Sequence, residues 1–90
     1  MAWQIKYTPE ADNTLISLGS NAETRIAKFM RERVSKLENP RSIGEPLKGN
    51  IFSGLWRYRV GDYRILCEIQ DEKITILVIF VGHRRKIYSK

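Results

Sequence analysis

Cysteine and histidine are nearly absent from this 90-residue chain, which has one of each, Cys67 and His83. A single cysteine excludes a disulfide within the chain and is typical of a reducing, cytoplasmic environment. One cysteine and one histidine also fall short of the ligand sets of the common zinc sites, so we expect no metal and no cofactor. Cys67 lies in an apolar stretch, which favours a packed thiol over a nucleophile.

Long hydrophobic runs are missing as well. The longest run extends from Ile74 to Val81 with Thr75 inside it, and it is far too short to cross a bilayer. The first six residues lack the apolar stretch of a secretion signal. We therefore expect a cytoplasmic protein with no membrane partner. With 42% apolar residues, the chain can build one modest core, and we expect a single domain over residues 1–90.

Acidic residues are outnumbered by basic ones, 10 against 16, which gives a net charge of +6. The excess is uneven: residues 1–47 carry 7 basic and 6 acidic side chains, and residues 48–90 carry 9 and 4. A basic surface of this kind favours a polyanionic partner, either nucleic acid or an acidic protein. Between residues 23 and 38 the basic residues are interleaved with glutamates, so we interpret that stretch as a solvated helix face.

The N-terminal part predicts a strand and the start of a helix. Residues 3–7 alternate apolar and polar side chains, as a strand does. Thr8 is a good N-cap and Pro9 suits the first helical position. We expect this helix to stop at Gly19.

A second helix follows directly. Ser20 and Glu23 match a capping box, in which each side chain satisfies a backbone N–H of the other residue. Asn39-Pro40 is expected to end the helix. Its apolar residues recur with helical spacing and predict a stripe packed on the core: Ala22, Ile26, Phe29, Met30, Val34 and Leu37.

The C-terminal part predicts a loop, a hairpin and a further strand. Residues 40–54 are rich in proline, glycine and polar residues, which is typical of a connection. The hairpin turns at Gly61-Asp62, and residues 74–81 read as a central strand covered on both faces. The tail over residues 82–88 leaves the end of that strand as a short tail or helix. The order β-α-α-β-β-β predicts an α+β fold with two helices on one face of a small antiparallel sheet.

The hairpin register carries the functional hypothesis. A two-residue type II′ turn pairs Arg59 with Arg64 and places Arg57 on the same face, with no acid among these three side chains. Like charges opposite each other destabilise a sheet, and guanidinium groups suit phosphate oxygens, so this face predicts an anion site. The other face is predicted to be core: Trp56, Tyr58, Val60, Tyr63, Ile65 and Cys67.

Several pieces of the sequence, in order, resemble the RelE/ParE superfamily of bacterial and archaeal toxins from toxin–antitoxin pairs. These pieces are the strand–helix–helix start, Leu47-Lys48-Gly49, the string from Arg57 to Arg64, and Val81-Gly82-His83-Arg84 leading to Tyr88. The resemblance covers essentially the whole chain and implies a RelE-like fold.

The resemblance to RelE-type toxins also implies an activity. Such toxins are endoribonucleases that cut mRNA in the decoding (A) site of the ribosome, with the RNA 2′-hydroxyl attacking the scissile phosphate and no metal involved. It implies that Arg57, Arg64 and Arg84 bind the phosphate and stabilise the transition state. It implies that Tyr88 stacks on a base or transfers a proton, whereas anchoring the tail is its structural alternative.

Other basic positions are given supporting roles by the same resemblance. Lys48 and Arg59 would grip the RNA backbone. Arg85 and Lys86 would bind phosphate or pair with acidic residues of an antitoxin.

The identity of the acid–base groups stays open. Leu55 stands where the best-known RelE pattern carries a lysine, so one candidate base is missing. His83 suits acid–base work at neutral pH, although a histidine at a strand end is also a common surface residue.

The implied partners are a cognate RelB-like antitoxin, the 30S decoding site and mRNA, with operator DNA bound only through the antitoxin. A ParE-like toxin that poisons DNA gyrase is the main alternative, and a basic binding module without activity is a third. The set formed by Arg57, Arg64, Arg84 and Tyr88 favours the nuclease, because a gyrase-binding protein has no need to bring these groups together.

Overall fold

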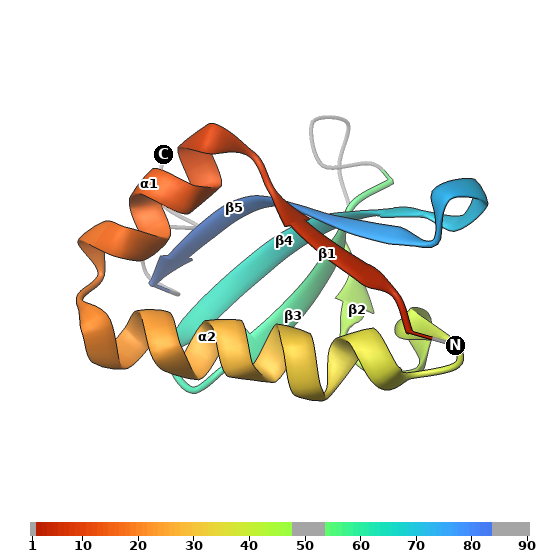
Figure 1. Cartoon of the computed structure of the whole chain (residues 1–90), viewed down its shortest axis with the longest axis horizontal. Coiled ribbons are helices and arrows are strands. Elements are labelled where there is room, and N and C mark those ends of the chain that lie inside the picture. Colours follow the sequence, from red (N-terminus) through yellow and green to blue (C-terminus); the bar gives the residue numbers. More distant parts are fainter. Residues whose placement is uncertain (1, 48–53, 84–90) are drawn as a thin grey trace.

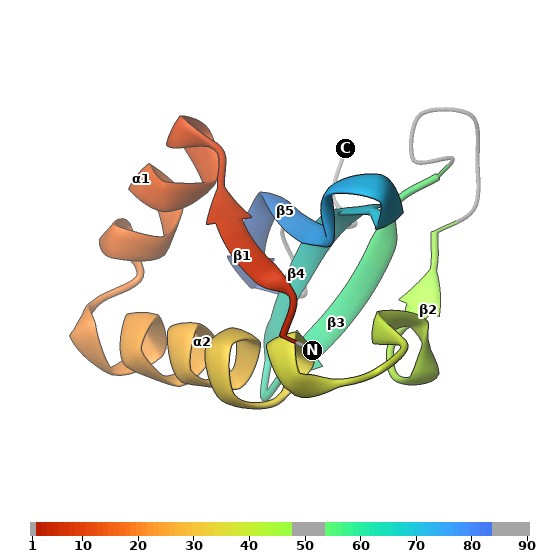
Figure 2. The same ribbon diagram turned by 45° about the vertical axis from the view of Figure 1, so that its right-hand side comes forward.

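A computed structural model describes residues 2–47 and 54–83 of the chain (Figure 1). Within these residues, two α-helices and three short 3-10 turns accompany a sheet whose strands lie in the order β1-β5-β4-β3-β2. The strands are β1 (Gln4–Tyr7), β2 (Glu45–Pro46), β3 (Trp56–Val60), β4 (Tyr63–Gln70) and β5 (Thr75–His83), and the helices are α1 (Pro9–Ser17) and α2 (Ser20–Glu32). Both helices lie on one face of the sheet (Figures 1 and 2), so the predicted α+β architecture is confirmed.

Helix α1 begins as predicted. The Thr8 side chain accepts a hydrogen bond of 3.1 Å from the backbone N–H of Ala11, and Pro9 occupies the first helical position. The helix ends one residue before Leu18, and Gly19 follows with a φ of +98°, in a region that favours glycine.

The capping box predicted for the second helix is wrong. Ser20 is already the first residue of α2, so Gly19 takes the N-cap position and makes no side-chain capping bond. The backbone N–H of Glu23 donates to the Gly19 carbonyl instead, at 2.9 Å. The helix also ends earlier than predicted, at Glu32, and a 3-10 turn over Val34–Lys36 continues it.

The sheet is mixed, whereas the sequence predicted an antiparallel one. Strand β1 runs parallel to β5, with Ile5 opposite Ile76, and the remaining pairs are antiparallel. The two helices between β1 and the rest of the sheet form the long connection that a parallel arrangement needs. Strand β5 is central, with a neighbouring strand on each side. The prediction that both of its faces are covered is wrong, because Phe80 is 39% exposed.

The hairpin register is confirmed. Val60 pairs with Tyr63 and Arg59 with Arg64, exactly two residues being left for the turn. Gly61 has a φ of +58°, whereas Asp62 is not among the residues with positive φ, as a type II′ turn requires.

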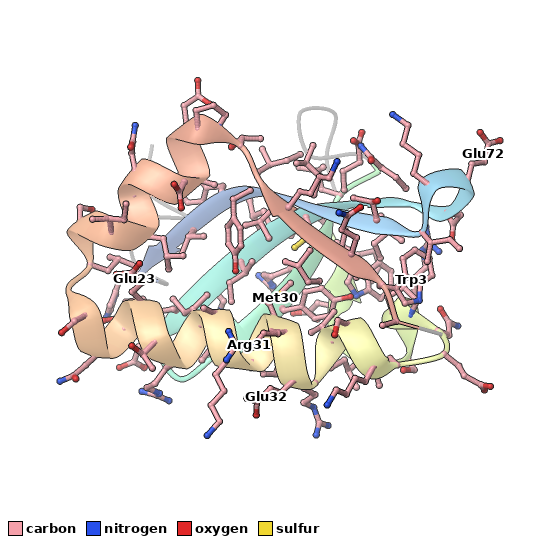
Figure 3. The ribbon with its side chains drawn as sticks, in the orientation of Figure 1. Trp3, Glu23, Met30, Arg31, Glu32 and Glu72 are labelled. Atoms are coloured by element: carbon pink, nitrogen blue, oxygen red, sulfur yellow. The ribbon has the colours of Figure 1, made fainter. Side chains whose placement is uncertain are left out.

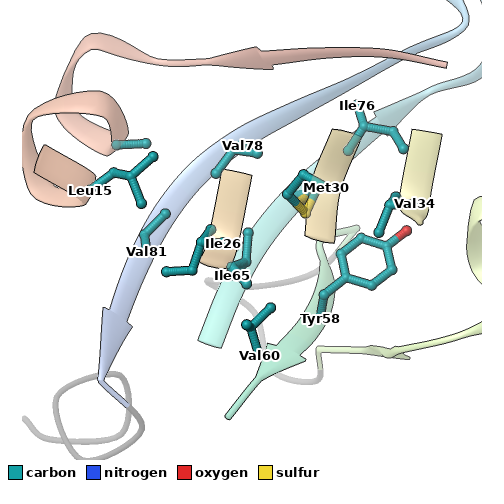
Figure 4. Packing of buried hydrophobic residues seen from close by; sticks show 12 residues of the cluster. Leu15, Ile26, Met30, Val34, Tyr58, Val60, Ile65, Ile76, Val78 and Val81 are labelled. Carbon is teal, nitrogen blue, oxygen red and sulfur yellow. The ribbon is translucent and has the colours of Figure 1, made fainter. Parts of the chain in front are cut away.

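The core fills the space between the helices and the sheet (Figure 4). The predicted stripe of α2 lies here, and Ile26, Met30 and Val34 are fully buried. They pack with Leu15 of α1 and with residues of three strands: Tyr58, Val60, Ile65, Ile76, Val78 and Val81. Cys67 is also fully buried, and burial raises the pKa of its thiol, which fits the predicted packed role. Neither described helix is long and apolar enough to span a membrane.

Candidate functional site: the arginine face

The sheet surface opposite the helices carries Arg57, Arg59 and Arg64, which we call the arginine face. Arg57 and Arg59 alternate with the core residue Tyr58 along β3, and Arg64 of β4 lies directly opposite Arg59. Period-two alternation on both strands therefore brings the three guanidinium groups to one surface, as the sequence predicted.

The charges of the arginine face act on one another. The pKa of Arg57 is lowered, first by burial and then by the positive charges of Arg59 and Arg64. Arginine starts from so high a pKa that Arg57 remains charged at neutral pH despite this lowering. A bound anion would relieve this repulsion, so the arrangement suits a phosphate.

The prediction that no acid lies among the arginines is wrong. Glu45 of β2 is the cross-strand partner of Arg57, and its carboxylate forms an ion pair with the Arg57 guanidinium. The same Oε2 atom lies 3.6 Å from Nη2 of Arg59. The sequence concealed this contact because Glu45 lies in a stretch that reads as a loop, without the alternation that marks a strand. The adjacent Pro46 is compatible with a short edge strand, and it is the local feature of the sequence that could have indicated β2.

Three side chains of the sheet and its turn anchor the segment that carries Glu45. The Tyr58 hydroxyl donates to the Pro40 carbonyl at 2.6 Å, and Trp56 Nε1 donates to the Ile43 carbonyl at 2.8 Å. Arg41 forms a two-pronged pair with Asp71, at 3.1 and 3.0 Å. Glu45 is therefore held in place by contacts with residues far along the chain.

Gly44 brings this segment close to β3. Its φ is +81°, and a Cβ atom here would lie 2.5 Å from the Arg57 carbonyl and 2.6 Å from Trp56 Nε1. A side chain would displace one of them, so only glycine allows the chain to approach this closely before Glu45.

Arg64 contributes a charge to the arginine face and also forms hydrogen bonds with the hairpin turn. The residue is only 8% exposed, and Nη1 donates to the carbonyls of Gly61 and Tyr63 at 3.2 and 3.1 Å. Part of the guanidinium thus stabilises the hairpin turn, which orients the rest of the group on the arginine face.

His83 lies on the other side of the sheet from the arginines. It is the cross-strand partner of Tyr63, and the two rings meet edge to face with centroids 5.9 Å apart. Since Tyr63 packs against the core on the helix side, His83 shares that side. The structure therefore does not bring His83 together with Arg57, Arg59 and Arg64.

The remaining predicted site residues lie outside the described part of the chain. They are Lys48, Arg84, Arg85, Lys86 and Tyr88, and their roles stay predictions. Within residues 2–47 and 54–83, no group of three or more histidine, cysteine or acidic side chains could hold a metal ion.

A hollow of about 380 Å³ opens beside the arginine face, where α2 faces the β2–β3 edge. Its volume falls within the range of small-ligand sites. Cationic and aromatic side chains contribute to its lining, which comprises Phe29, Arg33, Ile43, Gly44, Glu45, Arg57, Tyr58 and Arg59. Such a surface can take an anionic group and an adjoining planar one.

The fold agrees with that of known proteins. Residues 5–88 match the family described as the ParE toxin of type II toxin–antitoxin systems, parDE, and the chain belongs to this family within the RelE/ParE superfamily. It is thus a RelE-like toxin of a toxin–antitoxin system, as the resemblance implied.

Individual relatives match along the whole chain. Toxin RelG of Mycobacterium tuberculosis is 29% identical over 90 residues, which are all of both chains. The mRNA interferase toxin RelE of Escherichia coli is 29% identical and covers all of this chain and 94% of its own. The structure of the toxin–antitoxin complex RelBE2 from Mycobacterium tuberculosis superposes with a TM-score of 0.83 at 27% identity, covering 93% of each chain.

Proposed function

We propose that this toxin is a ribosome-dependent endoribonuclease that cuts mRNA in the decoding site and so inhibits translation. The observation that carries the proposal is the arginine face with one carboxylate set into it. The name of the Escherichia coli relative, an mRNA interferase, supports the same reaction.

The reaction needs charge stabilisation at phosphorus. Attack by the RNA 2′-hydroxyl forms a dianionic phosphorane, which collapses to a 2′,3′-cyclic phosphate and a 5′-hydroxyl. Arg57, Arg59 and Arg64 supply preorganised cations for the phosphorane oxygens, and removing one such group typically costs on the order of 100-fold in rate. Arg84 adds a further cation in this proposal.

A proton acceptor for the 2′-hydroxyl is also needed. Among the described residues, Glu45 is the carboxylate in contact with the arginine face, whereas His83 lies on the opposite side of the sheet. We therefore assign the proton acceptor to Glu45. Protonation of the 5′ oxygen then falls to Tyr88, the candidate that remains from the sequence.

The proposed partners follow from the charges and from the relatives. The complex RelBE2 contains a toxin and an antitoxin. For this chain we propose a RelB-like antitoxin that covers the arginine face with acidic residues, and contact with operator DNA only through that antitoxin. The ribosome and mRNA are the proposed targets of the free toxin.

Poisoning of DNA gyrase is not favoured, since the relatives that match the whole chain are named toxin RelG and mRNA interferase toxin RelE. The anchored Glu45–Arg57 pair also has no evident purpose in a surface that only docks on gyrase.

The decisive experiment supplies purified protein to ribosomes programmed with a defined mRNA and an empty A site, and maps breaks by primer extension. We expect codon-phased cuts that disappear in the Arg57→Ala, Arg64→Ala and Arg84→Ala variants. Circular dichroism must show each variant folded, because Arg64 also supports the hairpin turn. Lys73→Ala, on the exposed turn between β4 and β5, is the control and should cut normally. Intact mRNA with the wild-type protein would contradict the proposal and lead to a gyrase supercoiling assay.

A further inference from the structure

A second hollow on α2 continues the hollow beside the arginine face. This second hollow, which we call the helix groove, has a volume of about 320 Å³ and is lined by Arg25, Lys28, Phe29, Glu32 and Arg33. Phe29 and Arg33 also line the first hollow, so the two share a wall. The two hollows therefore adjoin, and together they extend from Arg57 and Arg59, past the edge of β3, to α2.

The helix groove is positively charged. Arg25, Lys28 and Arg33 are exposed, and none of the carboxylates in the described part of the chain lies within 4.0 Å of their charged nitrogens. The one acid in the lining, Glu32, pairs with Arg31 at 3.5 Å on the outer side of the helix (Figure 3). Three cations thus face one acid whose charge is already partly neutralised.

Arg25 connects the helix groove to the hairpin. A Cβ atom on Gly61 would lie 2.9 Å from Arg25 Nη2, so this guanidinium rests against the turn between β3 and β4. One cation of the helix groove therefore lies directly beside the hairpin whose strands carry the arginine face. Phe29 also lines the helix groove, and its ring meets that of Tyr58 edge to face with centroids 6.2 Å apart.

We propose that the helix groove binds the phosphate backbone of the RNA strand whose scissile phosphate lies on the arginine face. This inference rests on the proposed function, which makes RNA the ligand of the arginine face. A strand has regularly spaced phosphates, so cations next to the arginine face gain further contacts with the same molecule. These contacts add affinity without reading sequence.

Binding to uncleavable RNA tests this inference apart from catalysis. The probes are fluorescent 2′-O-methyl single strands of 3 and 12 nucleotides, measured by fluorescence anisotropy over a range of salt concentrations. We expect the short strand to bind on the arginine face, the proposed site of the scissile phosphate, whereas the long one can also reach the helix groove. We expect wild-type protein to bind the longer strand more tightly.

The test variant is Arg25→Gln/Lys28→Gln, and the control, Lys6→Gln/Lys73→Gln, removes the same charge from β1 and the β4–β5 turn. The test variant should bind the 12-nucleotide strand on the order of tenfold more weakly and lower its salt slope by about 1.4, the value for two lost phosphate contacts on a single strand. Its affinity for the 3-nucleotide strand should not change. Because Arg25 touches the hairpin and Arg33 also lines the hollow beside the arginine face, Lys28→Gln alone is the second variant. It should lower the salt slope for the 12-nucleotide strand by about 0.7, the value for one lost phosphate contact, and leave binding of the 3-nucleotide strand unchanged.

Three outcomes would overturn the inference. Wild-type protein could bind both strands with equal affinity, or the test and control variants could lose the same affinity for the 12-nucleotide strand. The test variant could also lose affinity for a polyglutamate peptide while keeping its affinity for RNA. The last would identify the helix groove as a surface for an acidic protein. Retained binding of the long strand in the helix groove without cleavage on ribosomes would instead contradict the proposed function alone.

Discussion

Glu45 and Arg57 face each other across the β2–β3 ladder, and the Glu45 carboxylate pairs with the Arg57 guanidinium while lying 3.6 Å from Nη2 of Arg59. One carboxylate oxygen is thus shared between two arginines of the arginine face. Under the proposed function this pair would have two effects: the acid would compete with phosphate for the arginines, and it would accept the proton of the 2′-hydroxyl.

Replacing Glu45 should separate these two effects. We expect Glu45→Gln to bind RNA more tightly, because a competing negative charge is gone, and to cut it about 100-fold more slowly or worse, as loss of a general base does. Binding of 2′-O-methyl RNA and single-turnover cleavage on ribosomes measure the two separately. Glu68→Gln, on the exposed part of β4, is the control. Unchanged cleavage in Glu45→Gln would disprove the assignment of the proton acceptor.

A side chain at Gly44 should displace Glu45. We expect Gly44→Ala to lose about 1 to 3 kcal/mol more stability than Gly19→Ala, because both glycines have positive φ but only a Cβ at Gly44 collides with its surroundings. Urea denaturation of both variants measures the difference. Equal losses would show that the close approach at Gly44 matters less than its backbone conformation.

The environment of Arg57 should make a lysine there sensitive to pH. Burial and the charges of Arg59 and Arg64 lower the pKa of this position, and lysine starts from about 10.4 rather than the higher value of arginine. A cation with a lowered pKa loses its proton as pH rises, so Arg57→Lys should retain RNA affinity near pH 6 and lose it progressively in alkaline solution. Affinities relative to wild type at each pH report this, and a ratio that stays the same at every pH would contradict it.

The Tyr58 hydroxyl should contribute to stability through Pro40. Tyr58→Phe leaves the Pro40 carbonyl without its hydrogen bond in a buried place, and we expect a loss of about 1 to 3 kcal/mol in the free energy of unfolding. Tyr7→Phe is the matched control, since no described residue hydrogen-bonds to the Tyr7 hydroxyl. Similar losses in both variants would mean that the bond from Tyr58 to Pro40 contributes no more to stability than a hydroxyl without that bond does.

The pair between Arg41 and Asp71 should give a pH-dependent contribution to stability. The hydrogen bond from Arg41 lowers the pKa of Asp71 below its usual 3.8, so the pair stabilises the folded state above that pH and is lost as the pH falls through the lowered value. Asp71→Asn should therefore melt slightly below wild type at pH 7 and converge with it in strong acid. Arg41→Gln should lower the melting temperature similarly, and the double variant no further.

Much of the local structure could be predicted because it depends on neighbouring residues. Thr8 caps α1 through a residue three positions away, and Gly61 sets a turn that fixes the register of both hairpin strands. The same register placed Arg57, Arg59 and Arg64 on one face. The capping box failed because Gly19 took the N-cap position that the sequence pattern assigned to Ser20.

Only part of the candidate site could be predicted, because the rest depends on contacts between residues far apart in the sequence. Strand β2 spans two residues and has no periodicity of its own, so its pairing with β3 depends on contacts with Trp56, Tyr58 and Gly44. The position of His83 relative to the arginines likewise depends on the register between β4 and β5, which no short turn determines.

The sequence by itself thus determined the helices, the hairpin and its basic face, since turn geometry and side-chain periodicity act over a few residues. Only the tertiary structure decided that β1 runs parallel to β5, that Glu45 lies among the arginines, and that His83 lies on the other side of the sheet. Each of these arrangements results from packing between segments far apart in the chain, where the free energy of the whole core, rather than any local preference, selects the partner.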